Sequence, residues 1–252
     1  MRYFTELAYN GTNYCGWQRQ PHSPTVQEKI EVAFSTILRV PITIHGCGRT
    51  DTGVHASQYF AHFDFAQVFP NGFIGRVNKF LPKDIVIKRI FEVSPEMSAR
   101  FDAYHRSYEY HLTFVKNPFE LETLFYFPFL RFLDIPKMQL AADLLLDYNE
   151  FFPFCKTKSD ANNMICDMKR AEWIYDEKAS RLVFHISANR FLRGMVRLIV
   201  GMCLNVGLGK LTLADVKLAL DKQVRLKKDL SVEAKGLFLT EIRYPFLDNK
   251  KQ

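Results

Sequence analysis

One short loop concentrates side chains that could do chemistry. It runs Gly48-Arg49-Thr50-Asp51-Thr52-Gly53-Val54-His55, so an arginine lies two residues before an aspartate. A firmly held carboxylate suits nucleophilic attack or proton abstraction, and a nearby guanidinium can fix its oxygens and balance charge. An ordinary turn, with Asp51 and Thr50 bonded to nearby amides, uses the same residue types. The arginine, the histidine and the flanking glycines favour a site, because glycine lets a substrate approach the backbone.

The surroundings of Asp51 in the sequence weigh against hydrolysis. Glycoside hydrolysis by water needs a second carboxylate at a set distance, and no other Asp or Glu lies near Asp51 in the chain. A hydrolase acting on glycosides or nucleosides is therefore the weaker enzyme hypothesis.

A second candidate is a row of arginines. Arg190, Arg193 and Arg197 recur at three- and four-residue steps in a segment predicted to be helical from about Arg190 to Val206, which would place them on one face. A solvent-exposed basic stripe explains Arg190 and Arg193 equally well. Arg197 has only apolar neighbours, and an arginine in such surroundings usually has a carboxylate or phosphate partner.

A third candidate is an aromatic strand. In the segment 107–115, Tyr108 and Tyr110 alternate with polar residues, an arrangement with which single-stranded RNA readers stack bases. Core packing is the simpler account of Leu112 and Phe114. The polar and aromatic segment Tyr14–Gln20 could be either a substrate-contact loop or a plain connection.

Periodicity, capping residues and turns predict the elements that would position these side chains. The first half is predicted to contain strands 2–9, 42–48, 57–65 and 84–93, a helix that starts at the capping box Thr25–Glu28, and a short helix around Phe73 to Phe80. The second half is predicted to contain strands 107–115, 164–175, 181–188 and 236–244, a helix capped by Asp134, the helix from Arg190, and a small helix capped by Thr212.

Apart from the small helix, both halves have the order β-α-β-β-α-β, which is the ferredoxin-like unit. The predicted fold class is therefore α+β. It consists of two ferredoxin-like halves, 1–103 with the Asp51 loop and 104–252 with the tyrosine strand and the arginine helix. The halves would share a mainly antiparallel sheet with a central cleft.

Composition narrows the class of protein. The formal net charge is +7, a weak indication of a polyanionic partner such as nucleic acid. Five scattered cysteines without a Cys-x-x-Cys pair favour a reducing compartment and argue against disulfides or zinc. We expect no signal peptide and no membrane span, since the longest apolar segment, 195–206, is too short. A soluble cytoplasmic protein without a metal is expected.

Several motifs together resemble the tRNA pseudouridine synthase A family. They occur in order along nearly the whole chain: Tyr9-Asn10-Gly11-Thr12 with Gly16-Trp17-Gln18, Gly48-Arg49-Thr50-Asp51 with Gly53-Val54-His55, Phe101-Asp102-Ala103, Tyr108-Glu109-Tyr110, Ala188-Asn189-Arg190-Phe191, Met195-Val196-Arg197 and Gly236-Leu237-Phe238-Leu239.

The resemblance implies specific roles. Asp51 would be the catalytic aspartate that isomerises uridine to pseudouridine, Tyr108 would stack on the target base, and Arg197 would pair with the aspartate. Arg49 would help to extrude the nucleotide. Tyr110 and Arg190 are further substrate-binding candidates.

The resemblance also implies that the protein is a cytosolic homodimer without cofactor or metal, and that its substrate is tRNA, at positions 38, 39 and 40 of the anticodon stem-loop. The chain departs from the family at Thr52, where alanine is usual, and at Ser231–Lys235, where a proline-containing pattern is usual. A non-catalytic RNA-binding protein of two ferredoxin-like units is the alternative.

Overall fold

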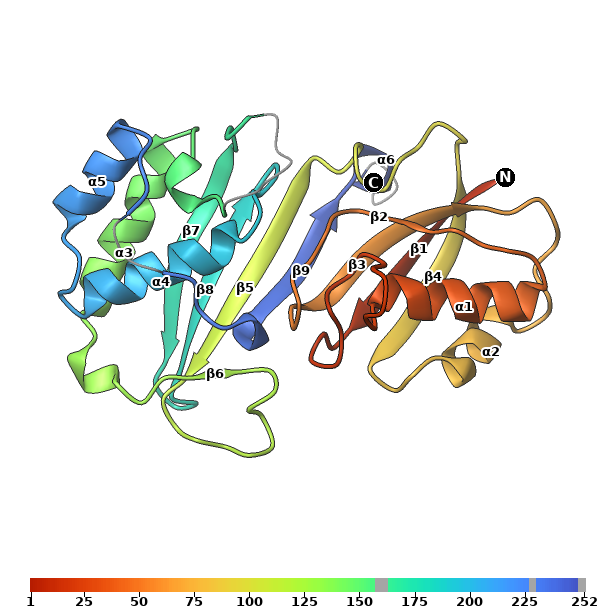
Figure 1. The fold of residues 1–252 in the computed structure, drawn as a ribbon, viewed down its shortest axis with the longest axis horizontal. Coiled ribbons are helices and arrows are strands. Elements are labelled where there is room, and N and C mark those ends of the chain that lie inside the picture. The colour runs from red at the N-terminus through yellow and green to blue at the C-terminus, as the bar shows by residue number, and fades with distance from the viewer. Residues whose placement is uncertain (157–162, 227–229, 249–252) are drawn as a thin grey trace. The chain divides into compact units, whose positions relative to one another are not determined.

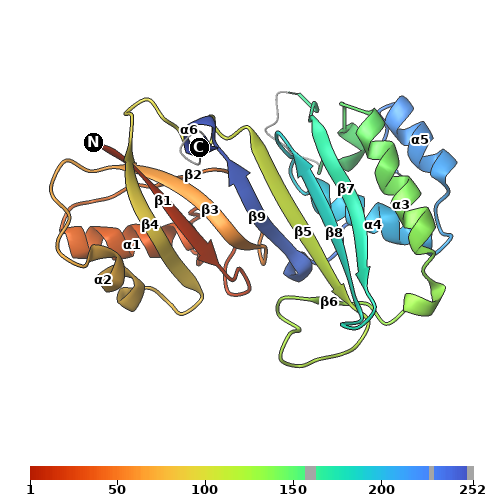
Figure 2. The ribbon, with the colours of Figure 1, turned by 180° about the vertical axis from the view of Figure 1, so that it is seen from behind.

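The computed structural model describes residues 1–156, 163–226 and 230–248. The chain forms two compact units (Figures 1 and 2). The first is made of Met1–Tyr104 together with the segment from Phe238 onward, and the second is His105–Leu237. Both units combine helices with a sheet whose strand pairs are mostly antiparallel, so the fold is α+β.

The sheet of the first unit is built around β1. Strand β1 pairs antiparallel with β3 on one side and with β4 on the other. The outer edge of β3 is divided, because β2 pairs antiparallel near its end and β9 pairs parallel at its start. The strands are β1 (Arg2–Tyr9), β2 (His45–Gly46), β3 (His55–Asp64), β4 (Ile85–Val93) and β9 (Leu237–Arg243), and the helices are α1 (Val26–Leu38), α2 (Phe73–Phe80) and α6 (Pro245–Asp248).

Both faces of this sheet are covered, which explains why β3 is buried almost without alternation. On one face, where Figures 1 and 2 show α1 and α2, Phe34 of α1 packs edge-on against Phe63 of β3. On the other face, Phe4 and Phe60 pack against Tyr244, which follows β9. The last strand, expected in the second half of the chain, therefore completes the first unit.

The sheet of the second unit is built around β8, which pairs antiparallel with β5 and β7, while β6 pairs parallel with β5. Figures 1 and 2 show α3 and α4 on one face of these strands. Gln139 of α3 also bonds to the backbone of β7, accepting from Trp173 N–H at 2.8 Å and donating to Ala171 O at 3.1 Å. The strands are β5 (His105–Thr113), β6 (Phe125–Tyr126), β7 (Met168–Asp176) and β8 (Arg181–Ala188), the α-helices are α3 (Ile135–Asp143), α4 (Met195–Gly207) and α5 (Leu213–Asp221), and the 3-10 helices are η1 (Leu130–Phe132), η2 (Leu144–Asp147), η3 (Phe152–Phe154) and η4 (Ala234–Gly236).

The predicted helix starts at the three capping residues are confirmed. Thr25 Oγ1 accepts from Glu28 N–H at 3.4 Å, and Asp134 accepts from Lys137 N–H at 3.0 Å. At α5, Thr212 and Asp215 form a full capping box. A side-chain oxygen satisfies an amide that the first helical turn leaves without a partner, and this explains why these signals can be read locally.

Three predicted elements are wrong in extent by more than two residues. The strand expected over 164–175 begins only at Met168. The strand expected over 42–48 is reduced to His45–Gly46. The helix expected from Arg190 begins at Met195, because Gly194 adopts the left-handed conformation with φ 70° and separates the helix from the preceding turn. Arg190 and Arg193 therefore lie outside α4, and the three arginines do not share a helical face.

Candidate functional site

The Asp51 loop is braced by the segment that follows β1. Trp17 N–H donates to Thr50 O at 3.4 Å, and Gly53 N–H donates to Tyr14 O at 3.2 Å. These hydrogen bonds join the main chains of the two segments on either side of Asp51. The segment Tyr14–Gln20, whose role the sequence left open, is therefore a structural brace for the candidate catalytic loop.

Two glycines allow the brace to lie directly on the loop. Gly16 has φ 86°, and a Cβ built there would lie 2.2 Å from Thr50 O. A Cβ on Gly11 would lie 2.0 Å from Val54 O. No side chain fits at such distances, so both motif glycines are required by backbone-to-backbone packing.

An aromatic cluster holds the start of the loop. The hydroxyl of Tyr59, on β3, donates to Gly48 O, and Trp17 stacks on the Tyr59 ring with centroids 4.0 Å apart. Both rings are buried. Burial raises the pKa of Tyr59 well above its ordinary value, so the hydroxyl keeps its proton and remains a donor.

His55 holds the other end of the loop. Its Nδ1 accepts from Gly11 N–H at 3.0 Å, and its ring stacks on Phe238 of β9 with centroids 4.5 Å apart. The acceptor role leaves Nδ1 without a proton, so the histidine serves here as a structural anchor.

Asp51 itself lies at the centre of this braced loop and is half-buried, while Arg49 is exposed. The main-chain carbonyl of Asp51 accepts from Val54 N–H at 3.1 Å, which closes a tight turn. The main chain thus forms a turn here, and bonding of the Asp51 and Thr50 side chains to nearby amides stays a prediction. A turn fixed from both ends presents its side chain in a defined direction, as a nucleophile requires.

Arg197 lies in the first turn of α4, in the second unit, and is half-buried. Its Nε donates to Val232 O at 2.7 Å, and Val232 N–H donates to Arg197 O at 3.4 Å. A Cβ on Gly201 would lie 1.6 Å from Leu230 O, so residues 230–232 run directly along the helix. The Nε of Arg197 thus bonds a carbonyl within its own unit, and its pairing with Asp51 stays a prediction.

The two tyrosines of β5 have different environments. Tyr108 is half-buried and lies edge-on to Phe191, with centroids 5.1 Å apart. Tyr110 is fully buried, and its hydroxyl donates to Glu233 O at 2.8 Å. Burial raises the pKa of Tyr110, so it too remains a donor. Tyr110 is therefore a supporting residue for the segment before β9 and, contrary to the expectation, offers no ring surface to a base.

Arg190 belongs to a hydrogen-bonded turn between β8 and α4. Its Nη1 donates to Asn163 Oδ1 at 3.1 Å. The neighbouring Asn189 accepts from Asp167 N–H at 2.8 Å and donates its own N–H to Asp167 O at 3.2 Å. The predicted role of Arg190 in substrate binding stays a prediction.

Of the candidate residues, Arg49 and Asp51 belong to the first unit, and Tyr108, Tyr110, Arg190 and Arg197 belong to the second. Sequence reasoning missed the supporting residue Tyr59, whose type resembles a core residue. His55 was counted as part of the loop, and the structure gives it the role of an anchor. The close approach of the backbone at Gly11 and Gly16 was not predicted either. Within the described residues, no cluster of His, Cys, Asp and Glu side chains could hold a metal ion.

Known proteins resemble the chain along its whole length. Residues 142–245 match the tRNA pseudouridine synthase family. The tRNA pseudouridine synthase A of Azobacteroides pseudotrichonymphae genomovar. CFP2 is 42% identical over 245 residues, covering 97% of both chains. The chain belongs to the tRNA pseudouridine synthase A family.

Relatives within the tRNA pseudouridine synthase A family come from distinct bacteria. The protein of Porphyromonas gingivalis is 43% identical and covers 97% of both chains. That of Francisella tularensis subsp. novicida is 36% identical and covers 99% of this chain and 96% of its own. Among the described helices, none is long and apolar enough to cross a membrane.

Proposed function

We propose that this protein isomerises uridine to pseudouridine in tRNA, at positions 38, 39 and 40 of the anticodon stem-loop. The observation that carries the proposal is the full-length similarity to proteins named tRNA pseudouridine synthase A. The braced position of Asp51 in the first unit supports it, because the reaction needs one firmly held carboxylate.

The reaction defines what the protein must do. The bond between N1 of uracil and C1′ of the ribose breaks, the base turns, and a bond forms between C5 and C1′. The proton on C5 is released and N1 takes up a proton, so the product is an isomer of the substrate. A base in a stem must first leave its stack, which costs a few kcal/mol. We assign the nucleophile to Asp51, base stacking to Tyr108, charge pairing with the aspartate to Arg197, nucleotide extrusion to Arg49 and substrate binding to Arg190.

The proposal extends to the fold and the assembly. The first unit has the strand arrangement β4-β1-β3-β2, with α1 after β1 and α2 after β3. The second has β5-β8-β7, with α3 between β5 and β7 and α4 after β8, and these orders support two ferredoxin-like halves. A cytoplasmic homodimer is proposed from family membership. The formal net charge of +7 suits binding to the phosphates of tRNA.

Release of tritium from tRNA labelled at C5 of uridine tests the proposal. The wild-type protein is expected to release tritium, and Asp51→Asn should lower the rate by roughly 10³-fold or more, since only the nucleophile is lost. Thr52→Ala is the matched control: it changes the exposed neighbour and restores the residue usual in the family, so its rate should stay within about twofold of wild type.

Substrates with one uridine at position 38, 39 or 40 test the site in tRNA. Absence of tritium release by the wild-type protein would contradict the isomerase proposal. Equal release by Asp51→Asn would contradict the role of Asp51. Tight binding of tRNA without chemistry would favour a non-catalytic RNA-binding protein, and free uracil would favour a hydrolase.

A further inference from the structure

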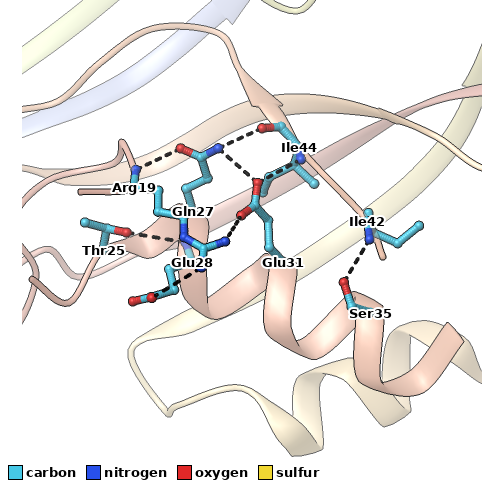
Figure 3. A network of polar contacts seen from close by, with 8 residues as sticks. All are labelled: Arg19, Thr25, Gln27, Glu28, Glu31, Ser35, Ile42 and Ile44. Atoms are coloured by element: carbon cyan, nitrogen blue, oxygen red, sulfur yellow. Dashed lines mark hydrogen bonds and ion pairs between the residues drawn. The ribbon is translucent and has the colours of Figure 1, made fainter. Parts of the chain in front are cut away.

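The segment before β2 uses helix side chains in place of a neighbouring strand. Figure 3 shows Ser35, Glu31 and Gln27 of α1 reaching the main chain of residues 42–44. Ser35 Oγ accepts from Ile42 N–H at 2.9 Å, and Glu31 Oε1 accepts from Ile44 N–H at 3.1 Å. Gln27 Nε2 donates to Ile44 O at 3.0 Å. These hydrogen bonds replace those of the strand that the sequence predicted here.

The same side chains also hold the brace of the Asp51 loop. Glu31 Oε2 accepts from Arg19 Nη1 at 3.3 Å, and Gln27 Oε1 accepts from Arg19 N–H at 2.9 Å. Gln27 Nε2 also donates to Glu31 Oε1 at 3.0 Å, so the two side chains form one unit. The backbone N–H of Gln27 donates to Trp17 O at 3.0 Å.

Of these two anchored segments, residues 42–44 lead into the loop along the chain, and the brace is hydrogen-bonded to it. Ile44 precedes β2 and Gly48, whose carbonyl is held by Tyr59. Arg19 follows Trp17, whose N–H is bonded to Thr50 O. Glu31 is only 6% exposed. A buried carboxylate is costly unless its oxygens are hydrogen-bonded, and here its two oxygens accept from both segments at once.

We infer that Glu31, together with Gln27, is a positioning residue for Asp51, an inference that rests on the proposed isomerase function. The carboxylate sets the separation of residues 42–44, which precede the loop, from the brace, which bonds Thr50 O and Gly53 N–H on the two sides of Asp51. A misplacement of a reacting group by about 1 Å can lower a rate on the order of 100-fold. Each of the two side chains bonds both segments, Glu31 through its two carboxylate oxygens and Gln27 through its amide oxygen and nitrogen.

Glu31→Gln and Glu28→Gln form a matched pair of variants. Both remove one negative charge from α1, but the Glu28 carboxylate lies 4.0 Å from Arg19 and its side chain is 33% exposed, against 3.3 Å and 8% for Glu31. With 5-tritiated tRNA, Glu31→Gln is expected to lower kcat about tenfold or more and to leave KM within about twofold. Glu28→Gln should change neither value.

Hydrogen–deuterium exchange provides a readout that does not depend on activity. In Glu31→Gln, exchange of the amides in residues 11–20 and 42–54 should rise at least about tenfold, while β1, β4 and the second unit keep wild-type rates. Gln27→Met is the second variant, to be used if Glu31→Gln does not fold, and the same local rise is expected. Wild-type kcat in an active, folded Glu31→Gln protein would overturn the inference.

Exchange that rises throughout the first unit would also overturn the inference, because Glu31 would then serve the general stability of that unit. Exchange that rises nowhere would overturn it as well, because Glu31 would then have no role in holding the loop. If the wild-type protein releases no tritium, the proposed function fails, and the local exchange pattern alone decides whether Glu31 positions the loop. Wild-type release combined with an unaffected Glu31→Gln protein would reject the positioning role and leave the isomerase proposal intact.

Discussion

Gly16 lies in the brace and Gly48 at the start of the Asp51 loop, and the two glycines differ in backbone conformation and in the space around them. Gly16 has a positive φ and approaches the carbonyl of Thr50, whereas a Cβ on Gly48 would meet no atom within 4 Å. Substitution at Gly16 therefore tests the close approach of the backbone, and substitution at Gly48 measures the effect of adding a Cβ where there is space for it.

We predict that Gly16→Ala lowers the free energy of unfolding by about 2–4 kcal/mol, because it combines a left-handed backbone with an overlap against main-chain atoms. The pseudouridine-forming rate should fall as well, since Thr50 adjoins Asp51. Urea unfolding and tritium release measure the two effects. Gly48→Ala is the control for stability, and its free energy of unfolding should stay within about 0.5 kcal/mol of wild type. Equal losses in both variants would show that the close approach at Thr50 is unimportant.

At the scale of elements, β3 carries both the end of the Asp51 loop and a buried histidine. His62 lies on β3 opposite Phe4 of β1 and His45 of β2. Its Nδ1 accepts from Ala99 N–H at 3.1 Å. Burial, then the charges of Arg2 and His45, lower its pKa to about 4. The imidazole is thus neutral in the folded protein at neutral pH.

We predict that His62 makes the protein less stable in mild acid. The unfolded state binds this proton near pH 6.5 and the folded state near pH 4, so stability is fully present above about pH 6.5 and is lost as the pH falls towards 4. The loss from His62 should be about 2 kcal/mol at about pH 4.5.

Urea unfolding at about pH 7 and pH 4.5 measures this loss. His62→Asn, whose amide oxygen takes the place of Nδ1 and can still accept from Ala99 N–H, should lose less stability than wild type on acidification by about that amount. His22→Asn, at an exposed position, should behave as wild type. The same pH dependence in wild type and His62→Asn would contradict the prediction.

At the scale of the whole molecule, the first unit is assembled from the two ends of the chain. Tyr244 is the main apolar contact of the later segment: it is fully buried, its hydroxyl donates to Ala99 O at 2.6 Å, and its ring packs edge-on against Phe4 and Phe60. The unit therefore cannot complete its core until the end of the chain is present.

The two tryptophans of the chain allow each unit to be followed separately, because Trp17 lies in the first unit and Trp173 in the second. We predict that Tyr244→Ala lowers the stability reported by Trp17, in a Trp173→Phe background, by about 3–5 kcal/mol. Tyr244→Ala should leave the unfolding of the second unit, reported by Trp173 in a Trp17→Phe background, unchanged. Leu145→Ala, in the core of the second unit, should give the reverse pattern. Identical shifts at both tryptophans would instead show that the units unfold together.

Much of the local structure could be predicted from the sequence, because it depends on neighbours in the chain. Thr212 and Asp215, for example, are three residues apart and cap α5 by bonding each other's amides. The family motifs around Asp51 were equally readable, since they are short and contiguous. The alternation of β5 predicted a strand, although it could not distinguish Tyr108 from Tyr110.

Other features were decided only by the tertiary structure, because they depend on contacts between residues far apart in the sequence. Residues 42–44 form no strand because side chains of α1 satisfy their amides and carbonyl. The turn at Gly194 decides where α4 begins, and the packing of Tyr244 on Phe4 and Phe60 places the segment after β9 in the first unit. The sequence by itself thus determined the chemistry available at Asp51, through its residue types and motifs. The packing of distant backbone segments at Gly11 and Gly16 determined how firmly Asp51 is held, since that packing exists only once the chain has folded.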